Sequence, residues 1–171
     1  MQRFLLAIAS FAALATVAAL PAAADTPTSF TLTAGTLSIS APTSSVSLGS
    51  QTVSSGASTI SGQLGVVTVT DQRGGATTWV ASVIVTAFTP TTGPAVTAIP
   101  ATEVSYAAGT ITQSGVTATK PATTDLTGVS PVVNGVSTGL STASWNPTIS
   151  VTLPANAAPG VYSGTITHSV A

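Results

Sequence analysis

The side chains able to carry acid–base chemistry are few and widely spaced in this sequence. The chain has one histidine, His168, and four acidic residues, Asp25, Asp71, Glu103 and Asp125. Catalysis by proton transfer, and glycoside hydrolysis in particular, needs two such groups held in one cleft. Their spacing brings no two of them together, and His168 falls on the apolar face of the last expected strand, where packing explains it. The sequence therefore predicts a protein that is not an enzyme.

The same shortage argues against bound metals and cofactors. A calcium loop needs acidic residues clustered within about a dozen positions, and that pattern is missing. The chain has no cysteine, so it forms neither a disulfide nor a zinc site built on thiolates. We therefore expect no cofactor and no metal.

Asp71 and Arg73 are the only opposite charges close together in the sequence. Two positions apart on a strand, they share a face and can pair across the end of a hairpin whose turn is Gly74-Gly75. Such a pair contributes about 0–1 kcal/mol of stability if it is exposed. The alternative is a polar element of a binding surface beside Trp79. We favour the structural interpretation, because isolated ion pairs near turns are common.

Aromatic side chains complete the set of candidate binding residues, because their rings can stack on the faces of sugars. Trp79 lies in the middle of an expected strand and should be buried, whereas Trp145 stands beside Pro147 and should be more exposed. A domain with so few aromatic residues needs most of them in its core. The candidate ligand-binding or partner-binding residues are Asp71, Arg73, Trp79, Trp145, Tyr162 and His168.

The elements that position these residues are expected to be β-strands. Apolar and polar residues alternate with a period of two, and helical periodicity is missing. The strand expected at 78–88 places Trp79, Ala81, Val83 and Val85 on one face. The other strong strands are expected at 65–71, 148–153 and 161–170, and weaker ones at 29–32, 36–40, 46–48, 59–63, 103–106, 110–112 and 139–143.

Glycine and proline divide these strands at short intervals along the chain. Many short strands with such turns predict an all-β fold, a single antiparallel β-sandwich of the immunoglobulin-like, Greek-key type. Residues 114–137 are the least patterned stretch, and we expect a long loop there.

The first two dozen residues have the pattern of a cleavable secretory signal peptide. Arg3 gives a basic start, residues 4–20 are almost wholly apolar, and residues 22–24 supply the small side chains of a cleavage site. We expect residues 1–24 to be the signal peptide, 25–34 a lead-in and 35–171 the folded domain. An uncleaved membrane anchor is the alternative, although the apolar run is at the lower limit for a spanning helix and no later stretch is long enough.

The chain after the signal is almost uncharged. Charged residues make up 4% of the sequence, against about 25% in typical soluble domains. Its only basic residues are Arg73 and Lys120, too few to neutralise a phosphate backbone, so nucleic acid is not an expected partner. The polar surface must consist of hydroxyl groups and backbone.

Two groups of motifs stand in a recognisable order. The first is Asp71, Arg73 and Gly74, a D-x-R-G element, followed by Trp79. The second comprises Leu153-Pro154 and the terminal run in which Tyr162, Ile166 and Thr167 are followed by His168 and Val170. Together they resemble the WxL domain family of Gram-positive surface proteins, whose terminal motif reads Y-x-x-x-L-T-W-x-L. Ala81 stands in place of the leucine of the first motif, and His168 in place of the second tryptophan.

The resemblance extends over about residues 35–170 and implies a β-sandwich at the cell surface. It also implies non-covalent association with the cell wall, through peptidoglycan or another wall polymer, and with other cell-surface proteins. Secretion through the expected signal peptide agrees with that location. The alternative is a structural or adhesive subunit that self-assembles through strand edges left free to pair.

Overall fold

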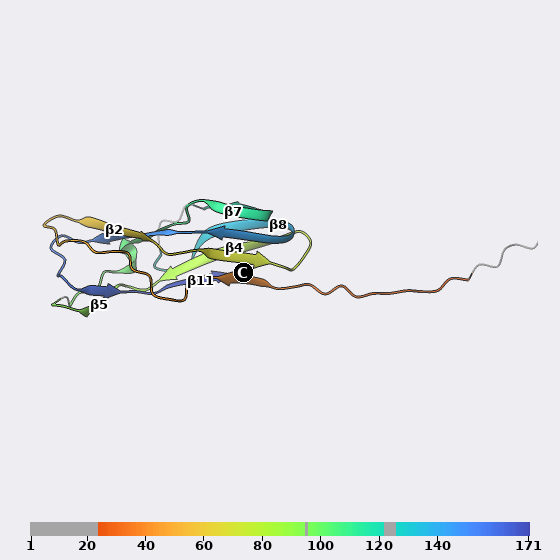
Figure 1. Cartoon of the computed structure of the whole chain (residues 1–171), viewed down its shortest axis with the longest axis horizontal. Coiled ribbons are helices and arrows are strands. Elements are labelled where there is room, and N and C mark those ends of the chain that lie inside the picture. The colour runs from red at the N-terminus through yellow and green to blue at the C-terminus, as the bar shows by residue number, and fades with distance from the viewer. Residues whose placement is uncertain (1–23, 95, 122–125) are drawn as a thin grey trace, which may run out of the picture. The chain divides into compact units, whose positions relative to one another are not determined.

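The computed structural model describes residues 24–94, 96–121 and 126–171. The expected signal peptide, residues 1–24, falls almost wholly outside these described residues. The chain divides into two units, Met1–Leu32 and Thr33–Ala171. In the first unit, the described residues belong to no strand or helix, and the second unit holds the strands (Figure 1).

The regular elements of the described chain are β-strands, apart from one 3₁₀ turn at Ala101–Glu103, so the all-β prediction is confirmed. No helix in the described part is long and apolar enough to cross a membrane. The strands are β1 (Leu37–Ser40), β2 (Ser58–Gln63), β3 (Val67–Asp71), β4 (Thr77–Val85), β5 (Thr89–Thr92), β6 (Val104–Ala107), β7 (Ile111–Thr119), β8 (Ser130–Trp145), β9 (Thr148–Leu153), β10 (Val161–Ser163) and β11 (Ile166–Val170).

β8 is the central strand of the largest sheet, and all of that sheet's pairings are antiparallel. Residues 141–145 of β8 pair with β3, and residues 130–137 pair with β4. β7 pairs with both stretches from the opposite edge. β8 turns sharply between these two stretches, where Oγ of Ser137 lies 2.7 Å from Oγ of Ser141. β1 pairs with β3 and β11 with β4, and the approach of β1 to β11 nearly closes the sheet.

Two smaller sheets, β2–β9–β6 and β10–β5, continue the strands of the large one. β2 leads into β3, β6 into β7 and β8 into β9, so three neighbouring strands change sheet at the same level. In the same way β4 leads into β5, and β10 into β11. Figure 1 shows β2 and β5 at the left-hand end of the folded unit, with β7, β8 and β4 to their right.

Asn146 fixes the corner where β8 turns into β9. Its Oδ1 accepts a hydrogen bond from the backbone N–H of Gly65 at 3.0 Å, and its Nδ2 donates to Oε1 of Gln63 at 3.0 Å. The backbone N–H of Leu64 donates to the carbonyl of Pro147 at 2.9 Å. The side-chain amide thus satisfies polar groups that the interrupted β2–β9 ladder leaves unpaired.

The core follows from the alternation in the sequence. Trp79, Ala81, Val83 and Val85 are all buried on the inner face of β4, as predicted. Opposite Trp79 in the register is Gly135 of β8. A Cβ atom at Gly135 would overlap the indole ring, so glycine leaves the space that the tryptophan fills.

The loop expected over residues 114–137 is wrong, because β7 extends to Thr119 and β8 begins at Ser130. Gly115 interrupts the alternation there: its φ is +68°, and the β7–β8 register shifts between Ser114 and Val116. The register there places Ser114 opposite Thr142 and Val116 opposite Ser137, so β8 carries three extra residues and the period-two pattern breaks although the pairing continues.

Three further strand predictions fail in detail. The segments 29–32 and 46–48 belong to no strand. Leu48 instead packs over Gly62 of β2, where a Cβ atom would lie 3.0 Å from the Leu48 Cα. The strand expected at 161–170 is divided into β10 and β11, because the chain bends at Gly164, packed against the Phe88 ring.

Replacing Gly135 with alanine should destabilise the protein by about 1–3 kcal/mol, because the methyl group must displace the buried Trp79 ring. Urea unfolding followed by tryptophan fluorescence measures the loss. Gly139→Ala, on the same strand with open space around it, is the matched control and should change stability by less than about 1 kcal/mol. Equal effects of the two substitutions would show that the close contact does not matter.

Candidate functional site

The Asp71 carboxylate, at the end of β3, is fully buried and accepts four hydrogen bonds. Its Oδ1 accepts from the backbone N–H of Arg73 at 3.1 Å and from Nε at 2.9 Å. Its Oδ2 accepts from Nη2 of Arg73 at 2.9 Å and from the Thr77 hydroxyl at 2.7 Å. The hydrogen bonds from the Arg73 side chain are the main reason why the pKa of Asp71 lies well below its usual value. They also raise the pKa of Arg73.

These contacts hold together two consecutive strands. β3 and β4 pair with β8 and not with each other, so the expected hairpin at Gly74-Gly75 is wrong. Both glycines have positive φ, 75° and 69°, and lie in the segment that connects β3 to β4. Because Asp71 is buried, the small contribution expected of an exposed pair does not apply. We call Asp71, Arg73 and Thr77 the strand clamp.

A second polar group joins β6, β8 and β11 inside the core. The indole N–H of Trp145 donates to the Tyr106 hydroxyl at 2.7 Å. That oxygen lies 3.1 Å from Nε2 of His168, and the Tyr106 and His168 rings meet edge to face. The expectation that Trp145 is exposed is wrong, since only 2% of it is accessible. Its N–H finds a buried partner on β6, which proximity to Pro147 in the sequence does not reveal.

His168 is half-buried, and this burial lowers its pKa. An indole nitrogen can only donate, so the Tyr106 O–H is free to donate to Nε2 of a neutral His168. The proton of that neutral ring then lies on Nδ1, which is buried without a hydrogen-bond partner. Burial also raises the pKa of Tyr106. The arrangement holds three strands together and presents no activated nucleophile.

The six candidate residues therefore fall into three places. Asp71 and Arg73 belong to the strand clamp, and Nη2 of Arg73 reaches the carbonyl of Thr78, next to Trp79. Trp79 is buried as predicted, with its Nε1 unpartnered. Trp145 and His168 meet at Tyr106. Tyr162 stands apart from the other five, and its hydroxyl donates to the carbonyl of Ala158 at 2.9 Å.

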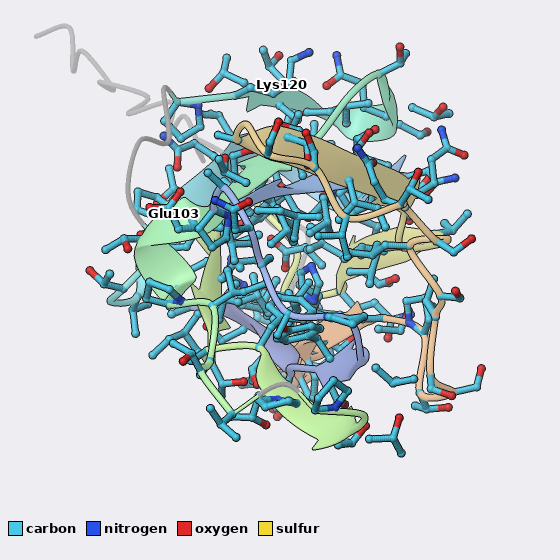
Figure 2. All side chains as sticks on the ribbon, turned by 90° about the vertical axis from the view of Figure 1, so that its left-hand side faces the viewer. Glu103 and Lys120 are labelled. Carbon is cyan, nitrogen blue, oxygen red and sulfur yellow. The ribbon has the colours of Figure 1, made fainter. Side chains whose placement is uncertain are left out.

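Tyr162 lines a groove of about 720 Å³ at the end of the folded unit that contains β2 and β5. Figure 2 looks onto that end of the molecule. Its apolar lining includes Ile60, Val151 and Leu153 of β2 and β9, and Phe88 before β5. The lining also includes residues 45–54 and 157–163, together with Ser58, Thr91, Ile99 and Pro154, and Tyr162 is the one ionisable side chain among the lining residues. We call this cavity the end groove.

A further surface escaped the sequence analysis, because it depends on which strands pair. The residues that alternate with the buried ones on β4, β7, β8 and β11 form one side of the large sheet, which we call the outer sheet face. Val80 and Ile84 are each 39% exposed there, and Val136 is 55% exposed. The face consists of Thr78, Val80, Ser82, Ile84, Thr117, Thr119, Asn134, Val136, Thr167 and Ser169.

The outer sheet face carries no ionisable side chain. Its cross-strand rows, such as Thr117–Val136–Thr78, place hydroxyl groups beside exposed aliphatic side chains. Exposed charge lies elsewhere: Figure 2 shows Glu103 and Lys120 on one side of the folded unit, and Nζ of Lys120 donates to the Gly109 carbonyl at 2.7 Å. Within the described residues, no three histidine or acidic side chains are grouped as metal ligands.

Comparisons of the chain with protein-family models, with curated proteins and with solved structures found no match.

Asp71→Asn should lower the free energy of unfolding by more than about 1 kcal/mol, because it removes the charged acceptor of the hydrogen bonds from Thr77 and from the partly exposed Arg73. Chemical denaturation at neutral pH measures the loss. Glu103→Gln removes an equal charge from an exposed residue and should have little effect. A loss below about 1 kcal/mol for Asp71→Asn would show that the clamp behaves like a surface ion pair.

Stability should fall as the pH drops below about 6.5, the pKa of an unfolded histidine. The folded pKa of His168 is lowered, so the unfolded chain binds more protons in this range and acid favours unfolding. Thermal unfolding between pH 8 and pH 5 tests this. His168→Gln keeps an acceptor for Tyr106 and should abolish the dependence; an unchanged dependence in this variant would contradict the assignment.

Proposed function

We propose that this chain is an exported, non-enzymatic protein of the cell surface, retained non-covalently by the cell wall through its outer sheet face. The observation that carries the proposal is that this face, spread over four strands, exposes aliphatic and hydroxyl side chains and no charge. Contiguous exposed apolar groups on a folded protein mark interaction sites. The proposed signal peptide would deliver the domain to the wall.

The chemistry of the face favours a neutral polymer as its ligand. Hydroxyl groups can exchange hydrogen bonds with sugar hydroxyls, while Val80, Ile84 and Val136 can pack against the apolar faces of sugar rings. The glycan strands of peptidoglycan offer both kinds of contact. Binding of this type should depend little on salt, because screening weakens contacts between charges.

The proposal also includes the type of β-fold. We propose an immunoglobulin-like β-sandwich of Greek-key type, supported by one core cluster that contains Val69 and Val83 of the large sheet and Ile149 and Val151 of the β2–β9–β6 sheet. The order of the WxL-like motifs also supports membership of that family. Because Asp71 and Trp79 are buried, we assign these motif residues to the scaffold and wall contact to the outer sheet face.

A second function, a structural subunit that self-assembles or joins other surface proteins, is favoured by a different observation. The segment before the folded unit exposes Phe30 and Leu32 almost completely.

Sedimentation with purified cell-wall sacculi tests the wall proposal. The exported protein should sediment with the sacculi at low and at high salt. The variant T78E/T117E places two charges in one row of the outer sheet face and should remain largely in the supernatant. The control T59E/S105E adds the same charge at exposed positions of β2 and β6 and should sediment like the wild type.

Wild-type protein left in the supernatant would contradict wall binding itself. Equal sedimentation of the wild type and both variants would contradict the outer sheet face as the binding surface. Circular dichroism of each variant confirms that a loss of binding does not reflect unfolding.

A further inference from the structure

The hydrophobic core of the folded unit borders the end groove. Leu48, Ile60, Phe88, Leu153 and Tyr162 all line the groove, and each is half-buried. These five side chains pack against the buried core cluster, yet none of them is fully covered. At this end of the fold, apolar side chains of the core therefore meet a cavity.

The groove is open to solvent between two segments of the chain. Residues 45–54 line it and belong to no strand or helix. The N–H of Asn156, in the loop between β9 and β10, donates to the carbonyl of Ser54 at 2.9 Å. Val53 in the first segment is 56% exposed, and Val161 of β10 is 59% exposed. A ligand can therefore enter from solvent without unfolding a strand.

The lining offers no charge to a ligand. Among the lining residues, the polar side chains are serine and threonine hydroxyls, the amide of Gln51 and the hydroxyl of Tyr162. The Tyr162 hydroxyl already donates to the carbonyl of Ala158. A charged group placed in the groove would lose hydration and find no ionic partner there. The groove therefore favours a neutral ligand.

The shape and chemistry of the apolar residues favour an aliphatic chain over a sugar. Ile60 and Leu153 contribute branched aliphatic side chains, which offer water few hydrogen-bond partners, so an apolar chain displaces that water at little cost. A sugar would need a free aromatic face. The Phe88 ring packs against Gly164, where a Cβ atom would lie 3.1 Å from the ring, so one of its faces is already covered.

We infer that the end groove binds the aliphatic chain of a neutral, single-chain amphiphile, with the uncharged polar end beside the hydroxyl groups of residues 45–54. The groove volume of about 720 Å³ is within the range of cavities that enclose small ligands, about 300–1,000 Å³. This inference goes beyond the proposed wall binding and does not depend on it.

Isothermal titration calorimetry of the exported protein with 1-decanol tests the inference. Binding should saturate at one molecule per chain. 1-Octanol should bind roughly 15-fold more weakly, because it buries two CH₂ groups fewer and each contributes a factor of about four. Decanoate at pH 8, where its carboxyl group is ionised, should bind at least about fivefold more weakly than 1-decanol, because the lining holds no cation.

A pair of double variants locates the site. V53E/V161E places two carboxylates at exposed positions of the groove lining and should weaken 1-decanol binding at least about tenfold, because an aliphatic chain cannot cover hydrated charges. V66E/V129E is the matched control: these valines are 59% and 69% exposed and lie outside the lining. The control should bind 1-decanol like the wild type. Circular dichroism confirms that both variants are folded.

Absence of saturable 1-decanol binding by the wild type overturns the inference, as does equal affinity for 1-octanol and 1-decanol. Decanoate that binds as tightly as 1-decanol overturns the assignment to neutral amphiphiles. Equal binding by the two double variants overturns the groove as the site. Wall binding is read out separately: V53E/V161E should still sediment with sacculi, and T78E/T117E should still bind 1-decanol.

Discussion

The buried Asp71 carboxylate is the contact on which the large sheet depends. β3 and β4 pair with different stretches of β8, and the chain passes from one to the other through Gly74-Gly75. Burying a carboxylate is costly unless its oxygens are fully hydrogen-bonded. Arg73 and Thr77 satisfy both oxygens, and they belong to the segment that must return to β8. The clamp therefore sets where β4 begins and, through it, where Trp79 enters the core.

The same principle applies where strands change sheet. Asn146 satisfies the backbone and side-chain groups freed at the β8–β9 corner, and Tyr106 satisfies the indole N–H of Trp145 on the adjacent strands. Asp71 and Asn146 thus lie where a regular ladder stops.

Local alternation was enough to predict the class of the fold and the inner face of β4, because a strand buried on one face must alternate. It was not enough for β7 and the first half of β8, where the bulge at Gly115 breaks the period. Alternation along one strand does not show which strands pair with each other. The motif residues were identified as binding candidates because they are rare, yet rarity also marks the residues that hold strand breaks and corners. The outer sheet face consists of common residues, and only the register of four strands brings them together.

The outer sheet face and the end groove lie on different parts of the fold. The outer sheet face belongs to β4, β7, β8 and β11, whereas the end groove is lined by β2, β9 and β10 and the loops around them. A ligand in the groove would therefore leave the sheet face open. On the proposed function, weak neutral contacts between the sheet face and the wall would be repeated along the cross-strand rows, and repeated contacts on linked units bind far more tightly than one alone.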